Sequence, residues 1–118
     1  MSSRKLAAGT LVGVAGELDI TNSGQLAGYL NDRHPDWALP LVLDMAAVTF
    51  MDSSGVHLLI DLHHREDASG GSLHLAAPHA RVTRVLEIIG TDRLLRTHPS
   101  LSTAMAAAHL TLWPTCRG

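Results

Sequence analysis

The segment from residue 41 to residue 60 constrains the fold more than any other part of the chain. It begins with an apolar run, Leu41-Val42-Leu43, and ends with a helix-like run, Val56-His57-Leu58-Leu59-Ile60. Between them lies the polar segment Asp52-Ser53-Ser54-Gly55. A strand that is buried on both faces reads as continuously apolar. The pattern therefore predicts a central strand over Leu41–Met45, followed by a helix with two hydroxyl groups at its start.

Strand and helix patterns alternate along the rest of the chain. Further strands are expected at residues 6–8, 10–18, 72–77 and 94–96. Further helices are expected at residues 24–31, from Pro78 to a cap at Gly90, and from Ser100 or Ser102 to Ala108. Strands that are joined by helices favour parallel pairing. We therefore predict an α/β fold with a mixed or parallel sheet of four to five strands and about four helices packed on it.

The expected core faces follow from residue spacing. Leu26 and Leu30 lie four apart on one face of the helix at 24–31, which Thr21, Asn22 or Ser23 could cap. In the helix after Ser54, the predicted inward stripe is Val56, Leu59, Ile60 and His63. In the helix before Gly90 it is Val82, Val85, Leu86 and Ile89.

Length and composition limit the class of protein. A chain of 118 residues fits one domain, with a core at about 6–108 and an irregular tail at 109–118. A net charge of −2 without a basic stripe argues against a direct nucleic-acid partner. The apolar runs are too short to cross a membrane. Cys116 is the single cysteine and no signal-peptide pattern precedes it, so we expect a cytoplasmic protein.

Eight histidines raise the question of a metal site. His57 and His64 share a helix face, but they lie two turns apart, roughly 10 Å, which is too far for one ion. No pair of cysteines supports zinc. The sequence therefore predicts no metal and no cofactor, with most histidines in contact with solvent.

Four segments together resemble the STAS domain, and more narrowly the bacterial anti-sigma factor antagonists. They are Gly16-Glu17-Leu18-Asp19, the strand from Leu41 to Asp44, Asp52-Ser53-Ser54-Gly55, and Val85-Leu86-Glu87-Ile88-Ile89-Gly90. The resemblance extends over nearly the whole chain, roughly from Leu6 to Ala108. It implies a non-enzymatic protein that regulates transcription by exchanging binding partners.

The resemblance also implies a mechanism and a site. The unphosphorylated domain would bind an anti-sigma factor with a GHKL-type serine kinase domain and so free the sigma factor. Phosphorylation at Ser54 would dissociate the complex, and a serine phosphatase would restore it. Asp19, Asp52, Ser53 and Gly55 would lie beside this switch. His57, one turn after Ser54, stands where the family more often has a small or apolar residue.

Three other interpretations stay open. Ser54 can be an ordinary residue of a helix cap, because serine and aspartate both suit that role. The chain can be a STAS scaffold or accessory module, stressosome-like or part of a lipid transporter, that is not switched at Ser54. A serine hydrolase is the enzymatic alternative, although Ser54 lacks the Gly-x-Ser-x-Gly elbow.

Overall fold

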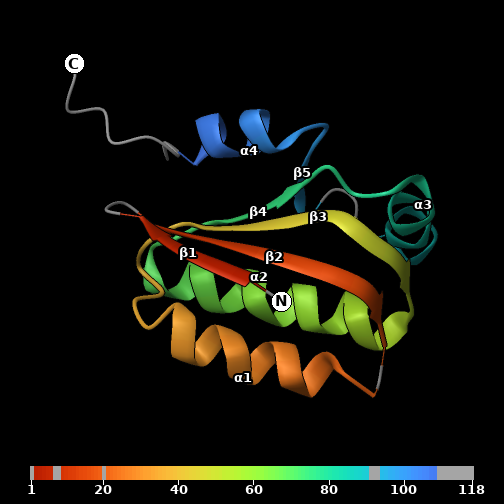
Figure 1. The fold of residues 1–118 in the computed structure, drawn as a ribbon, viewed down its shortest axis with the longest axis horizontal. Helices are drawn as coiled ribbons and strands as arrows, with labels where there is room; N and C mark the ends of the chain where they lie inside the picture. The colour runs from red at the N-terminus through yellow and green to blue at the C-terminus, as the bar shows by residue number, and fades with distance from the viewer. Residues whose placement is uncertain (1, 7–8, 20, 91–93, 109–118) are drawn as a thin grey trace.

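The computed structural model describes residues 2–6, 9–19, 21–90 and 94–108 of the chain. They form a five-stranded sheet with helices on both faces (Figure 1). The strands are β1 (Ser2–Leu6), β2 (Gly9–Leu18), β3 (Leu41–Met51), β4 (Leu73–Ala76) and β5 (Arg96–His98). The helices are α1 (Ser23–Arg33), α2 (Ser53–Ser69), α3 (Ala80–Ile89) and α4 (Leu101–Ala107).

The strands are arranged in the same order in the sheet as in the chain, from β1 to β5. β1 is antiparallel to β2, whereas the pairs β2–β3, β3–β4 and β4–β5 are parallel. Helices make the parallel crossovers, as expected where a chain must return to the same edge of a sheet. The predicted α/β fold, with a mixed sheet of five strands and four helices, is therefore confirmed.

Two apolar layers hold the helices to the sheet. The larger layer lies on the face covered by α1 and α2, and it includes Leu43 from β3 and Leu30 from α1. The smaller one lies under α4 and joins Val42 and Ala76 to Met105. Alternate residues of β3 thus face opposite layers, and both are inaccessible to solvent. The continuous apolar run at residue 41 has this physical cause.

Several predicted strand boundaries were wrong. The first strand is Ser2–Leu6, not residues 6–8, and residues 7 and 8 lie outside the described part. The last strand is Arg96–His98 instead of residues 94–96, because β4 pairs with that later segment. β3 runs on to Met51, past the predicted end at Met45, because its second half pairs with β2. The predicted tail at 109–118 also lies outside the described residues.

The predicted inward stripe of α2 was wrong in its second half. Its buried residues are Gly55, Val56, Leu59, Leu62 and Glu66. Ile60 and His63 are only half-buried. The buried stripe runs through Leu62 to Glu66, whose buried carboxyl group is paired with His34.

The expectation that most histidines contact solvent is confirmed for the described residues: His34 and His74 are buried, at 1% and 5% exposure, and the others are exposed or half-buried. Two other expectations need revision. In α3, Val82 and Leu86 face the core as expected, whereas Ile89 is 43% exposed. Asn22 stands at the N-cap of α1, but its side chain makes no cap hydrogen bond.

Candidate functional site

Asp52 joins β3 to α2. Its carboxylate Oδ1 accepts the main-chain N–H groups of Ser54 at 2.8 Å and of Gly55 at 3.2 Å. The first N–H groups of a helix have no partner within the helix, and an aspartate cap satisfies two of them here. The predicted capping role of Asp52 is therefore confirmed in the structure.

The two serines occupy the first turn of α2 behind this cap. Ser53 is exposed and Ser54 is half-buried. Among the described residues, the Ser54 hydroxyl has no hydrogen-bond partner, since Asp52 performs the capping. His57 lies one turn further along α2 and is exposed. The helix dipole places about half a positive charge at this end of α2, which favours a negative group there.

Gly55 packs closely against the end of β2. A Cβ atom at this position would lie 2.6 Å from Cγ of Met51 and 2.9 Å from the carbonyl oxygen of Leu18. The main-chain N–H of Asp52 donates to the same Leu18 carbonyl at 3.2 Å. Glycine is therefore required for the start of α2 to lie against the end of β2.

Asp19 follows directly after β2 and forms a tight turn. Its Oδ1 accepts both the main-chain N–H of Thr21, at 2.9 Å, and the Thr21 hydroxyl, at 2.5 Å. These bonds, with a smaller contribution from the main chain of Asn22, lower the pKa of Asp19. Asp19 is therefore ionised at neutral pH, at the same end of the sheet as the start of α2.

A pocket of about 210 Å³ opens beside this turn, between the end of β2 and the start of α1. Its lining residues are Val14, Ala15, Glu17, Leu18, Asn22, Gln25 and Leu26. Two register shifts bend β2 on this side, and Gly16 takes a φ of 85° between them. Glycine adopts that backbone conformation without steric cost. The bend exposes Glu17 at the rim.

The structure brings most of the predicted site residues to one end of the sheet. The hydrogen bond from Asp52 to the Leu18 carbonyl links the loop that holds Asp19 to the turn that holds Ser53 and Ser54. Sequence reasoning missed the role of Thr21, although an aspartate followed two residues later by threonine is a known turn pattern. The pocket was not predicted either, because a glycine is the only trace that a bend in a strand leaves in the sequence.

Two further observations concern the part of the chain that the structure describes. None of its helices combines the length and the apolar character needed to cross a membrane. No group of three or more histidine, cysteine or acidic side chains in this part is arranged to hold a metal ion.

Comparison with known proteins identifies the family. Residues 5–104 match the model of the STAS domain, and the chain therefore belongs to the STAS domain family. A candidate anti-sigma factor antagonist from Thermotoga maritima shares 21% identity and a TM-score of 0.84 with this chain, over 92% of this chain and 93% of the other. The anti-sigma factor antagonist SpoIIAA, in its unphosphorylated form, gives 18% identity and a TM-score of 0.72, over 93% and 97%.

A second kind of protein carries the same fold. The murine anion transporter Slc26a9, a member of solute carrier family 26, matches with 23% identity and a TM-score of 0.77. The match covers 90% of this chain but only 18% of the transporter. These sequence identities are low, so the structural likeness shows the fold and does not show which partner this chain binds.

Proposed function

We propose that this protein is an anti-sigma factor antagonist whose binding to an anti-sigma factor is switched by phosphorylation of Ser54. The observation that carries the proposal is the division of roles at the start of α2. Asp52 caps the helix, and the Ser54 hydroxyl makes no hydrogen bond within the described structure. A hydroxyl group that is not needed for the cap is available for modification.

The electrostatics of this end of the sheet support a switch that acts on the partner. A phosphate adds about −1.5 to −2 charges, which the N-terminal end of a helix accommodates. Asp52 and the ionised Asp19 add negative charge at the same end. A partner surface fitted to the neutral serine would meet a clash and an unpaired charge. A loss of about 3 kcal/mol would weaken binding on the order of 100-fold.

The proposed partners follow from the same mechanism. The anti-sigma factor would have a GHKL-type serine kinase domain, and a serine phosphatase would reverse the modification. Gly55 would keep α2 against β2, while Ser53 and His57, both exposed, would contact the partner. This role requires no catalytic group, metal or cofactor in the chain itself.

The test is a pull-down from a lysate of the source organism with four baits analysed side by side by mass spectrometry. The baits are the wild type, Ser54→Ala, Ser54→Asp and, as a control for charge one residue away, Ser53→Asp. We expect a protein with a GHKL-type ATP site on the wild-type and Ser54→Ala baits, and its loss on Ser54→Asp. Equal capture of the same proteins by all baits would rule the switch out.

The likeness to Slc26a9 favours one second candidate, an accessory STAS module that stays bound to its partner. Such a module would give a constitutive complex that is indifferent to Ser54. Mass spectrometry after incubation of the chain with lysate and ATP separates the two candidates, because only the antagonist should yield a peptide phosphorylated at Ser54.

A further inference from the structure

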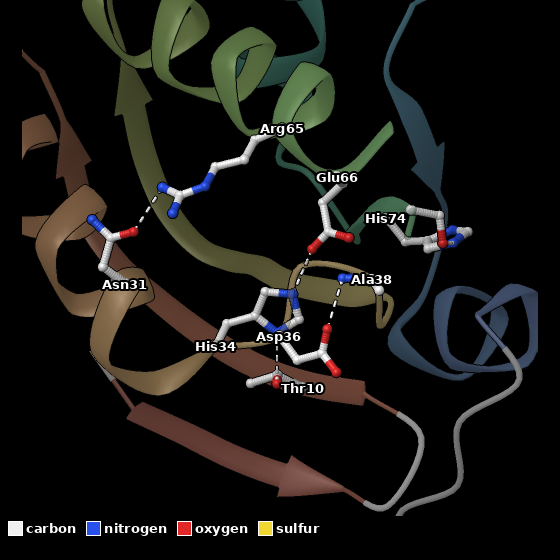
Figure 2. A network of polar contacts seen from close by, with 9 residues as sticks. Thr10, Asn31, His34, Asp36, Ala38, Arg65, Glu66 and His74 are labelled. Carbon is white, nitrogen blue, oxygen red and sulfur yellow. Dashed lines mark hydrogen bonds and ion pairs between the residues drawn. The ribbon is translucent and has the colours of Figure 1, made fainter. Parts of the chain in front are cut away.

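A buried polar network lies toward the other end of α2 from Ser54 (Figure 2). Glu66 Oε1 lies 2.5 Å from Nε2 of His34, and Nδ1 of the same ring lies 2.8 Å from the hydroxyl of Thr10. The three residues come from α2, from the residue after α1 and from β2. All three are at most 2% exposed. The network therefore ties three separate segments together inside the larger core.

The second carboxyl oxygen of Glu66 has unusual surroundings. Oε2 is buried and has no hydrogen-bond partner among the described residues. It lies beside Gly71, where a Cβ atom would overlap it and would also lie 2.5 Å from the carbonyl oxygen of Trp37 and 2.8 Å from that of Leu39. Oε2 and two main-chain carbonyl oxygens therefore converge on one small space. Oxygen lone pairs that face each other without a hydrogen between them repel.

The same number of protons can be arranged in two ways. In an ion pair, the His34 ring donates to Thr10 and to Glu66 Oε1, and Oε2 stays a charged oxygen that faces carbonyl groups. In a neutral pair, the Thr10 hydroxyl donates to Nδ1 of His34, and Nε2–H donates to Oε1. Oε2 then carries the proton and donates a hydrogen bond to a carbonyl. In the ion pair the buried Oε2 accepts no hydrogen bond among the described residues, although the Ser72 main chain favours the charged carboxyl group. In the neutral pair Oε2 has a hydrogen to donate, so this buried atom gains a partner.

Burial, more than the charged groups nearby, favours the neutral form of Glu66. Burial raises the pKa of Glu66, while the His34 side chain and, less strongly, the Ser72 main chain oppose this shift. Asp36, in the loop after α1, raises it further. Arg65 is not among the groups that shift the pKa of Glu66. Its guanidinium group lies 4.2 Å from the centre of the Trp37 ring and donates to Asn31 at 2.7 Å.

One further histidine lies near this end of the sheet. His74 of β4 is hydrogen-bonded to Ser72 and to His98. Its side chain alternates with those of Leu73 and Leu75, which belong to the core layer under α1 and α2. His74 therefore points to the opposite face of the sheet from Glu66.

We propose that Glu66 is a proton-dependent latch: its neutral carboxyl group donates from Oε2 to a main-chain carbonyl at Trp37 or Leu39. The latch holds the C-terminal end of α2 against the loop after α1. When the proton is lost, the carboxylate repels those carbonyls and this junction loosens. The device is independent of Ser54, which lies at the other end of the same helix.

The sign of the pH dependence follows from proton counting. The pKa of Glu66 is raised in the folded chain above its ordinary value of 4.5. The folded state then binds a proton that the unfolded chain has released. The stabilisation is complete below pH 4.5 and is lost as the pH rises through the folded pKa.

Nuclear magnetic resonance of the wild-type chain locates the proton directly. The ¹³C shift of the Glu66 carboxyl carbon and the ¹⁵N shifts of the His34 ring are measured at pH 6. We expect a neutral acid and a neutral imidazole. A carboxylate beside an imidazolium ring would overturn the proposal, and this measurement needs no variant to fold.

Urea unfolding of Glu66→Gln tests the latch itself, because glutamine can accept from His34 and donate to a carbonyl without titrating. At pH 6 we expect an unfolding constant within about threefold of the wild type. As the pH rises from 4.5 through the folded pKa of Glu66, the wild-type constant should rise by up to tenfold per pH unit relative to that of Glu66→Gln, since one proton is released.

The matched control is Glu87→Gln, which changes an exposed carboxyl group and should keep the wild-type slope. Loss of stability of 100-fold or more in Glu66→Gln at pH 6, failure of this variant to fold, or an unchanged slope would each contradict the latch.

Discussion

The Asp52 carboxylate accepts the main-chain N–H of Ser54 at 2.8 Å, so the residue that caps α2 is bonded to the backbone of the proposed phosphorylation site. Removing the cap should weaken the helix without touching the Ser54 hydroxyl. We expect Asp52→Ala to lower the free energy of unfolding by about 1 kcal/mol. Urea denaturation followed by circular dichroism measures it.

The control for this variant is Asp52→Asn, because asparagine caps a helix about as well as aspartate. We expect it to keep near-wild-type stability while it removes one negative charge beside Ser54. Equal destabilisation of both variants would mean that the charge, not the cap, stabilises this turn.

Gly55 permits the contact between α2 and β2, and a larger residue should not fit there. Gly55→Ala would place a methyl group against the Leu18 carbonyl and Met51, so we expect a loss of about 1–3 kcal/mol in unfolding free energy. Gly28→Ala is the matched change in α1, where a Cβ atom meets nothing within 4 Å. That variant should be about 0.5–1 kcal/mol more stable than the wild type. A stable Gly55→Ala protein would show that β2 and α2 can separate freely.

Two positions of α3, two residues apart, differ sharply in burial. Leu86 is fully buried, whereas Ile88 is 75% exposed. We expect Leu86→Ala to lower the free energy of unfolding by about 2–5 kcal/mol. Ile88→Ala should change it by less than about 0.5 kcal/mol. Thermal and urea unfolding of the two variants would test this, and a large loss at Ile88 would indicate that this side chain is covered by a second molecule.

The parts of the fold that could be predicted are those that local sequence determines. The apolar run at Leu41 fixed the central strand, and Asp52 with the two serines marked the start of α2. Gly90 ends α3 with a φ of 85°, as its position after an apolar pattern indicated. In each case the physical cause lies within a few residues of the signal.

The parts that could not be predicted depend on partners that are distant in the sequence. Glu66 interrupts an apolar stripe, and only the approach of His34, thirty-two residues away, makes its burial possible. β5 is defined by its pairing with β4, since its own three residues, Arg96–His98, have no apolar pattern. The pocket near Asp19 depends on a bend in β2 and on the position of α1.

A phosphomimetic change at Ser54 should leave the domain folded. The helix dipole stabilises a negative charge at the start of α2 by about 0.3–1 kcal/mol, and repulsion from Asp52 offsets part of this gain. We therefore expect Ser54→Asp to unfold within about 1 kcal/mol of the wild type, with a difference that shrinks as salt is added. Urea denaturation followed by circular dichroism, at low and high salt, measures the stability difference and its dependence on salt. If Ser54→Asp were largely unfolded, loss of partner binding in that variant would reflect unfolding, and charge repulsion at the interface would no longer explain the switch.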